Sequence, residues 1–443
     1  MISCTTFNIL APIYKRVDEE NRESQYRCNW LTRNQNILDW LMCERSSILC
    51  LQEFWVGNQE LVHMYEKRLA DAGYLFFILP RTNNRGDGLL TALHKDRFRV
   101  LNYRELLFND LGDRVAQLLH AQSVQQQFLI VNTHLLFPHN SSLSIVRLHQ
   151  VYKILEYVES YQKDHNLNPM SIILCGDWNG SKRGHVYKFL RSQGFVSSYD
   201  TVHRYTDSDA DAHKWVSHRN HRGNICGVDF IWLLNPNKYR KPLKASWSET
   251  LFSIVKYQFR KASLTGKDAF AFLKADSRGG YITYSGFCEA LNQLGLTGHP
   301  HGLSAEETKD LWIQADVDGD GIVDLKKFQK RIWDPSWLEQ TEENSEEAKE
   351  DVREDSAKLA IGFNVESIWD PSWLEQTEEN SEEAKEDVRE DSVKLAIGFN
   401  VENAVLFPPE VEKGMWPENY SLSDHARLTV VFSPIQVPLF QHI

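Results

Sequence analysis

The sequence predicts an α/β protein in which two β-sheets pack face to face and helices cover their outer faces. Over the first 235 residues, short apolar runs of strand character alternate with longer stretches that carry apolar residues at helical spacing. Polar side chains of the kind that enzymes use stand where several of these runs end. A chain of 443 residues can bury a large core and is long enough for more than one domain.

The expected elements follow one another in a regular order. Strand-like runs occupy residues 2–10, 48–51, 89–93, 115–119, 128–131, 171–174, 228–234, 404–409 and 428–432. Helical spacing of apolar residues is found in 31–42 and 144–161. Many strands with few helices suit two stacked sheets that bury one face against each other and the other against helices.

Six short polar motifs stand at the ends or starts of these runs. They are Thr6-Phe7-Asn8, Leu51-Gln52-Glu53, Asn132-Thr133-His134, Gly176-Asp177-Trp178-Asn179, Gly227-Val228-Asp229 and Ser423-Asp424-His425. Carboxylate and carbonyl oxygens are the ligands that Mg²⁺ prefers, and His and Asn can hold a phosphoryl oxygen. A single motif has an ordinary structural explanation, such as a strand-end cap or a buried histidine. The six together predict an active site.

The order and residue types of these motifs resemble the endonuclease/exonuclease/phosphatase superfamily of metal-dependent phosphodiesterases, over residues 1–245 and 403–443. The stretch 6–11 with Tyr14 looks most like the deadenylases of the carbon catabolite repressor and nocturnin branch. The resemblance implies a four-layer α/β sandwich and a Mg²⁺ (or Mn²⁺) cofactor. It further implies hydrolysis of single-stranded RNA by a 3′–5′ deadenylase-like exoribonuclease.

The resemblance also assigns roles around the metal and the attacking water. Glu53 is the principal Mg²⁺ ligand, Asn8 lies beside it and helps to hold the metal or the phosphate, and Asp424 is an outer ligand on the metal or the phosphate side. Asp177 aligns and deprotonates the water, and Asn179 donates to a phosphate oxygen.

Two histidines are expected at the phosphate. By the resemblance, His425 donates to the phosphoryl oxygen and Asp229 orients its imidazole, so these two residues must meet. His134 contacts the phosphate from the opposite side, with Asp87 as its expected partner.

Contacts with nucleic acid are less defined. Trp55, Trp178 and Trp215 are available for stacking on bases. The stretch 218–222 is rich in His and Arg and either contacts phosphate or forms a solvated loop.

A calcium-binding motif is inserted after the strand that carries Asp229. Residues 316–324 match an EF-hand loop, with ligands expected from Asp316, Asp318, Asp320, Ile322 and Asp324. Position 12, where a bidentate Glu should stand, is Lys327. We therefore expect weakened Ca²⁺ binding or an EF-hand fold that binds no metal. Residues 276–287 lack the carboxylates and predict a non-binding partner EF-hand.

An acidic repeat follows the EF-hand pair. Residues 332–366 recur at 368–402 with one difference, Ala357 against Val393, and each copy has eleven acidic and three basic residues. These copies account for more than the net charge of −12, so the rest of the chain is at +4 and compatible with a polyanionic substrate. We expect this segment to be disordered.

The domain organisation follows from these features. Residues 1–245 and 403–443 form the catalytic domain, 246–331 an all-α EF-hand insertion, and 332–402 the acidic segment.

Seven unpaired cysteines indicate reduced thiols and an intracellular protein, cytoplasmic or nuclear. No apolar run approaches the ~20 residues needed to span a bilayer. Met1 precedes the first motif so closely that no cleaved signal peptide is expected.

Other functions remain open. The same mechanism could act on phosphoinositide, DNA or a dinucleotide, because proteins of one fold differ in their substrate loops. A non-catalytic, calcium-responsive binding protein is the alternative of another class. Every motif keeps its chemical type, which favours the enzyme.

Overall fold

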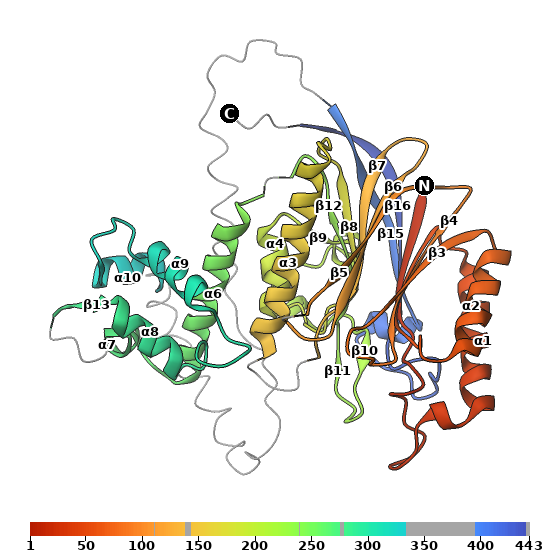
Figure 1. The fold of residues 1–443 in the computed structure, drawn as a ribbon, viewed down its shortest axis with the longest axis horizontal. Helices are drawn as coiled ribbons and strands as arrows, with labels where there is room; N and C mark the ends of the chain where they lie inside the picture. Colours follow the sequence, from red (N-terminus) through yellow and green to blue (C-terminus); the bar gives the residue numbers. More distant parts are fainter. Residues whose placement is uncertain (110, 138–142, 239, 275–278, 334–394, 440–443) are drawn as a thin grey trace. The chain divides into compact units, whose positions relative to one another are not determined.

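The computed structural model describes residues 1–109, 111–137, 143–238, 240–274, 279–333 and 395–439 (Figure 1). They divide into two compact units, and the boundary falls within helix α3. One comprises the described residues of Met1–Phe137, Gln150–Arg240 and Glu366–Ile443, the other those of Pro138–His149 and Lys241–Val365. No helix in the described ranges is long and apolar enough to cross a membrane.

The first sheet joins the two ends of the chain. Its strand order is β15-β16-β1-β2-β4-β3, and β1 lies parallel to β2 and antiparallel to β16. The N-terminal strand is therefore held between an early strand and the last one. The strands are β1 (Ile2–Asn8), β2 (Ile48–Phe54), β3 (Tyr74–Pro80), β4 (Gly88–His94), β15 (Leu395–Phe407) and β16 (Arg427–Pro438).

The second sheet brings three motif residues into one row. Its order is β5-β6-β7-β8-β12-β9, and only β7 and β8 are parallel among its pairs. In the register, His134 at the end of β7 and Asp229 at the start of β12 both stand opposite Asp177, the last residue of β8. The strands are β5 (Arg99–Leu107), β6 (Val115–Gln122), β7 (Gln127–His134), β8 (Ser171–Asp177), β9 (Val196–Ser197) and β12 (Asp229–Leu234).

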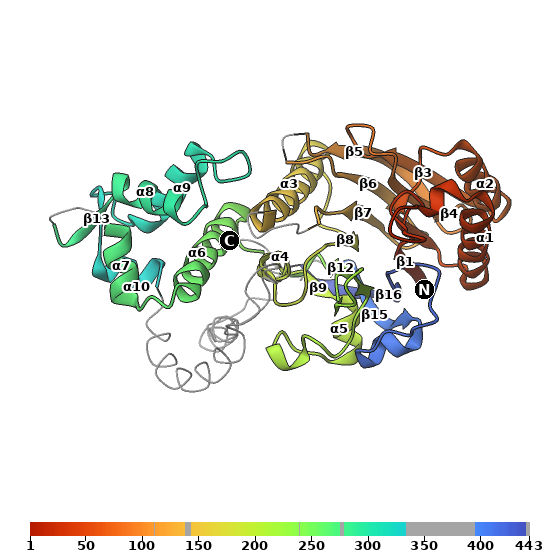
Figure 2. The ribbon, with the colours of Figure 1, turned by 90° about the horizontal axis from the view of Figure 1, so that it is seen from below.

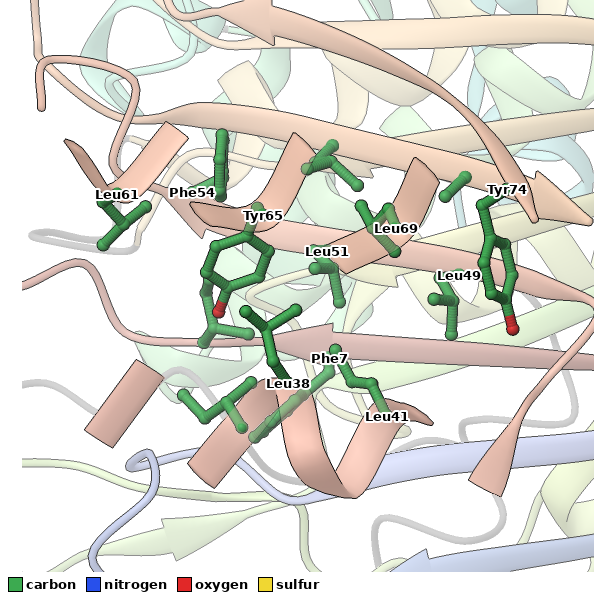
Figure 3. Packing of buried hydrophobic residues seen from close by; sticks show 14 of the residues in the cluster. Phe7, Leu38, Leu41, Leu49, Leu51, Phe54, Leu61, Tyr65, Leu69 and Tyr74 are labelled. Carbon is green, nitrogen blue, oxygen red and sulfur yellow. The ribbon is translucent and has the colours of Figure 1, made fainter. Parts of the chain in front are cut away.

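Helices α1 (Arg27–Glu44) and α2 (Gln59–Asp71) cover the outer face of the first sheet (Figures 1 and 2). Figure 3 shows Leu38 and Tyr65 of these helices beside Phe7 and Leu51 of the strands. Alternate residues of β1 and β2 point to opposite faces, so this apolar packing leaves Asn8 and Gln52 on the inner face.

Aromatic and apolar side chains cover the outer face of the second sheet. Tyr187 of helix α4 packs edge-on against Phe230 and Trp232, and Tyr161 of helix α3 packs against His120. The helices here are α3 (Leu143–Asp164), α4 (His185–Ser192) and α5 (Ser198–His203), and a hairpin forms from β10 (His218–Arg219) and β11 (Ile225–Cys226).

The space between the sheets contains buried polar contacts as well as apolar packing. Nε2 of Gln52 donates to Oδ1 of Asn132 at 2.8 Å, and the hydroxyl of Thr91 donates to Gln117 at 2.6 Å. Because buried amides must be hydrogen-bonded, these contacts fix how the two sheets face each other.

The second unit is an EF-hand pair. Two helix–loop–helix motifs are joined by β13 and β14, with Ile282 opposite Val323. Ser304 and Glu307 form a capping box at the start of α9. The elements are α6 (Leu243–Lys261), α7 (Gly266–Lys274), β13 (Tyr281–Thr283), α8 (Tyr284–Gln293), α9 (Ala305–Ala315), β14 (Ile322–Asp324) and α10 (Leu325–Arg331).

The predicted fold class is confirmed, with differences in detail. The insertion is not purely helical, because each loop contributes a three-residue strand. Strands β3 and β5 were not predicted; β5 is an edge strand without regular alternation of buried and exposed residues.

The acidic segment is shorter than predicted at both ends. Ile332 and Trp333 are buried, and the Trp333 ring packs near Phe259 and Phe328. At the other end, β15 begins at Leu395 instead of after residue 402. The predicted disorder of the centre falls on 334–394, outside the described residues.

Candidate active site

The six motifs meet at one edge of the two sheets. Strands β1, β2, β7 and β8 end there and β12 begins there, so each delivers its polar residue to the same place. All of these residues belong to the first unit.

Asn8 lies at the centre of the group and is fully buried. Its Nδ2 donates to Oε1 of Glu53 at 3.1 Å and to Oδ2 of Asp177 at 3.0 Å. Nε2 of His425 lies 3.4 Å from the same nitrogen. One carboxamide thus links the expected metal ligand, water-aligning carboxylate and phosphate-binding histidine.

The side chain of Glu53 is turned out of the strand pattern by its backbone. Its φ of 54° lies in the left-handed region, and the pairing of β2 with β4 is irregular between Leu51 and Phe54. Such irregularities re-aim side chains next to active sites. Desolvation, helped by the charges of Asp424 and Asp87, raises the pKa of Glu53 to about 7.

His425 forms a dyad with Asp229. Nδ1 of the imidazole lies 2.9 Å from Oδ2 of Asp229, and Nε2 lies 3.6 Å from Oδ2 of Asp177. Burial lowers the pKa of His425, but the charges of Asp229 and Asp177 outweigh it and raise the pKa well above its usual value. The charges of these two carboxylates thus favour the imidazolium form, in which Nδ1–H is donated to Asp229.

Two neighbouring residues support this dyad, Ser423 in the loop before β16 and His218 in β10. Ser423 donates its hydroxyl to the carbonyl of Asn8 at 2.6 Å and accepts the backbone N–H of His425. The ring of His218 stacks on His425 with centroids 4.3 Å apart. The His-rich stretch thus contributes His218 to the site, as a neighbour of the His425 imidazole.

His134 lies on the other side of Asp177. Its Nε2 is 3.2 Å from Oδ2 of Asp177, and its Nδ1 is 2.9 Å from Nη1 of Arg114. Burial and the charge of Arg114 lower the pKa of His134 well below its usual value. The predicted partner, Asp87, instead accepts from Tyr14 at 2.7 Å and from Arg81 at 3.1 Å. The prediction of a direct Asp87–His134 contact is therefore wrong.

Asp177 is held by its own loop. Its Oδ1 accepts the backbone N–H of Asn179 at 2.9 Å, and Nδ2 of Asn179 donates to the carbonyl of Leu135 at 2.9 Å. Gly176 permits close approach of β7 here, because a Cβ would lie 2.0 Å from the carbonyl oxygen of Thr133. The amide of Asn179 thus ties the end of β8 to the residue after β7.

Two of the three tryptophans offered for base stacking are in the core. Trp178 and Trp215 are buried, and the indole N–H of Trp215 donates to Asp200 at 3.0 Å. Trp55 is partly exposed and packs edge-on against Trp30. Of these three tryptophans, only Trp55 is partly exposed.

The donor set fits a divalent cation. Each Glu53 carboxylate oxygen accepts one hydrogen bond, from Asn8 or from the backbone of Ala11, and keeps a further lone pair. Oδ1 of Asp424 is buried with no hydrogen-bond partner among the described residues. An unsatisfied carboxylate oxygen beside a glutamate of raised pKa is chemistry that a hard cation would satisfy.

The EF-hand loop of the second unit holds an ammonium group. Nζ of Lys327 donates to Asp316 at 3.1 Å, to Asp320 at 2.7 Å and to the carbonyl of Ile322 at 2.8 Å, and also contacts Asp318. Asp324 caps α10 by accepting the backbone N–H of Lys327. Four of the five expected calcium ligands thus face Lys327, and the fifth caps a helix.

Comparisons with known proteins agree with the geometry. The sequence model of the endonuclease/exonuclease/phosphatase family matches residues 5–240. The chain is 58% identical over 450 residues to an uncharacterized calcium-binding protein of Arabidopsis thaliana, covering 98% of this chain and 85% of that protein.

More distant similarity is found with an exoribonuclease subunit and with nocturnin. The CCR4-Not complex 3′-5′-exoribonuclease subunit of Debaryomyces hansenii is 22% identical over 291 residues, 54% of this chain and 34% of that protein. The human nocturnin catalytic domain, solved with bound sulfate, superposes with a TM-score of 0.41 at 21% identity, over 52% of this chain and 82% of that one. The chain belongs to the endonuclease/exonuclease/phosphatase family and is a hydrolase of its metal-dependent type.

Proposed function

We propose that the protein hydrolyses phosphodiester bonds of single-stranded RNA with Mg²⁺ or Mn²⁺, as a 3′–5′ exonuclease of the deadenylase type. The observation that carries the proposal is the convergence of Glu53, Asp177 and His425 on the buried amide of Asn8. The RNA substrate is supported by the relative that is named a 3′-5′-exoribonuclease subunit.

Glu53 and Asp424 would hold the cation, with Asn8 fixing one oxygen of Glu53. When bound, the ion would supply Lewis acidity and offset the charge of the phosphoryl oxygens. The carboxylates need this partner, because the raised pKa of Glu53 shows how poorly the desolvated site tolerates its charge.

Asp177 would accept the proton of the attacking water. Its two oxygens are already oriented by Asn8, His134 and the backbone of Asn179, so the carboxylate needs no rearrangement to act. Removing this base should lower kcat by about 10²- to 10⁴-fold.

His425 would donate Nε2–H to a phosphoryl oxygen as negative charge develops. Its imidazolium form is maintained by Asp229, which takes the other N–H. His134 and Asn179 would keep Asp177 and the β7–β8 edge in place. In this structure one N–H of the Asn179 amide donates to the carbonyl of Leu135. The second N–H of that amide would donate to a phosphate oxygen.

A substrate panel tests the proposal. Poly(A) RNA, mixed-sequence RNA, single-stranded DNA, a dinucleotide and a phosphoinositide are each incubated with the full chain and Mg²⁺. We expect 3′ shortening of RNA that is lost in Asp177→Asn, with the exposed Asp39→Asn as the matched control. Hydrolysis of another substrate alone would move the proposal to that class, and no hydrolysis of any would favour a binding protein.

Calcium would bind only weakly to the EF-hand loop. The relative named as calcium-binding supports an EF-hand in this lineage. However, the loop oxygens that would bind the ion already accept hydrogen bonds from Lys327. Calcium would have to displace that ammonium.

A further inference from the structure

Arg114 directly precedes β6 and was not part of any predicted motif. The residue is only 7% exposed, and Nη1 lies 2.9 Å from Nδ1 of His134. Its loop is fixed from behind, because Asp113 accepts from Arg81 at 2.5 Å and pairs with Arg85. The guanidinium is therefore a fixed donor at the back of the site.

The contact determines where His134 carries its proton. A guanidinium has donors and no acceptor, so Nδ1 of His134 must accept and cannot bear hydrogen. A neutral imidazole then has its proton on Nε2, which lies 3.2 Å from Oδ2 of Asp177. Arg114, His134 and Asp177 thus form a chain of donors that ends on the carboxylate.

We propose that Arg114 is a positioning residue that fixes His134 in the Nε2–H tautomer, so that His134 donates to Asp177. The catalytic consequence rests on the proposed function, whereas the tautomer does not. Without Arg114, His134 can also adopt the tautomer with hydrogen on Nδ1. Its Nε2 then carries no hydrogen and cannot donate to the carboxylate of Asp177. Oδ2 of Asp177 would then accept a hydrogen bond from Asn8 but none from His134.

The tautomer can be read directly by ¹⁵N NMR of the full chain with labelled histidine, using His134→Asn to assign the signals. We expect an unprotonated Nδ1 and a protonated Nε2 in the wild type. Arg114→Met should give mixed or inverted shifts, and Arg114→Lys should restore the wild-type pattern in part. A protonated Nδ1 in the wild type, or shifts unchanged in Arg114→Met, would overturn the assignment.

Kinetics on the substrate found by the panel provide the second readout. Arg114→Met should lower kcat by about 10- to 100-fold with KM nearly unchanged, as for residues that orient a catalytic group. A raised KM with unchanged kcat would mean that Arg114 binds substrate directly, and would also overturn the proposal. Should Arg114→Met not fold, Arg114→Leu, which also carries no donor, provides the same comparison.

A second inference rests on a different observation, the position of the Lys327 ammonium. It lies among the oxygens at positions 1, 3, 5 and 7 of the loop, the places from which an EF-hand binds calcium. A lysine ammonium is charged at neutral pH and has three donors and no acceptor, so it can take the place of a cation among these oxygens.

The ammonium also performs the structural task of the ion. Asp316 oxygens accept from Lys327 and from the backbone N–H of Gly321, which closes the loop on itself. The loop then enters β14 in register with β13. A tethered cation supplies this closure without the entropy cost of capturing a free one.

We infer that Lys327 is a built-in cation that holds the loop closed, so that the EF-hand pair keeps its fold without calcium. The unit would then be insensitive to calcium changes in the physiological range. The residue at position 12 would then act as a substitute for calcium instead of as a calcium ligand.

Three full-length proteins test the inference by calorimetric calcium titration, with fluorescence of Trp312 on α9 as a structural signal. The wild type should show no binding at micromolar Ca²⁺ and the same melting curve with and without EGTA. Lys327→Glu should gain binding in the micromolar range. Lys327→Met, which adds no ligand, should melt at lower temperature than the wild type in EGTA. Micromolar binding by the wild type, or a Lys327→Met variant as stable as the wild type in EGTA, would refute it.

Discussion

The Nδ1 atom of His425 lies 2.9 Å from Oδ2 of Asp229, although 196 residues separate them. Asp229 opens β12 and His425 stands just before β16, so the contact joins the two parts of the first unit on either side of the insertion. The side chain of Asp229 is fully buried, which makes its ionised form dependent on the imidazolium.

Asp229→Asn should shift the pH range of activity. Asp229 and Asp177 raise the pKa of His425 against the effect of burial, and an amide cannot replace the carboxylate. The pKa should fall by about 1–3 units, so the alkaline limit of hydrolysis moves to lower pH. A kcat–pH profile measures this, with Asp39→Asn as control; an unchanged alkaline limit would exclude a role for the dyad.

The same raised pKa makes stability depend on pH. A histidine whose folded pKa exceeds its unfolded pKa contributes stability that is fully present below the unfolded value of about 6.5. That contribution is lost as pH rises through the folded pKa. The free energy of unfolding in urea should therefore be higher for the wild type than for Asp229→Asn, and this difference should decrease at high pH.

Metal binding at Glu53 should have the opposite pH dependence, because stabilisation by the cation should increase as the pH rises. Its pKa of about 7 means that protonation stabilises the metal-free fold, an effect present near pH 4.5 and lost as pH rises through 7. A divalent cation competes with this proton, so stabilisation by Mg²⁺ or Mn²⁺ should grow from pH 6 to pH 8.

Melting temperatures with and without millimolar Mn²⁺ at three pH values measure this effect. Glu53→Gln should abolish the metal effect and should melt above the wild type at pH 8 without metal, because a desolvated charge has been removed. Equal stabilisation by Mn²⁺ in the variant would place the cation elsewhere. EDTA should likewise stop hydrolysis in the wild type, with recovery on adding Mg²⁺.

The sequence was sufficient to predict the polar residues that stand at the ends of strands. It was insufficient to predict which side chains from different strands contact one another. Asn8, Glu53, Asp177 and His425 could be predicted because their motifs keep a fixed order along the chain. Arg114 could not, because its role depends on a contact with His134 that arises only when β6 and β7 pair.

The EF-hand shows the same limit in a different form. Lys327 was recognised as a missing ligand from its position in the loop. That its ammonium would reach back to the loop oxygens depends on the side-chain conformation, which spacing does not contain. Likewise, Asp87 was assigned to His134 by analogy, whereas Tyr14 and Arg81 satisfy it.

Gly176→Ala should unfold the edge that carries Asp177. The φ of 150° and the 2.0 Å approach of a Cβ to the Thr133 carbonyl oxygen leave no space for a methyl group. We expect destabilisation of about 3 kcal/mol or more in urea denaturation, together with loss of activity. Gly280→Ala is the matched control, since nothing lies within 4 Å of its Cβ. Equal stability of the two variants would contradict the close β7–β8 approach.

The buried bond between Gln52 and Asn132 should be a coupled pair. Nε2 of Gln52 donates to Oδ1 of Asn132 at 2.8 Å across the sheet interface, and each amide is fully buried. Gln52→Met alone removes the donor to Oδ1 of Asn132 and should cost about 1–3 kcal/mol, whereas in Asn132→Leu, Nε2 of Gln52 keeps Thr6 and the Cys50 carbonyl as acceptors.

A double-mutant cycle in urea separates this coupling from packing. The double variant should be less destabilised than the sum of the singles by about 1 kcal/mol, because no amide of the pair remains unpaired. Gln52→Met combined with the exposed Arg68→Ala should be additive. Glu53 follows Gln52 directly, so Gln52→Met should also weaken Mn²⁺ binding while Arg68→Ala should not. Additivity of Gln52 with Asn132 would mean that this hydrogen bond does not couple the two sheets.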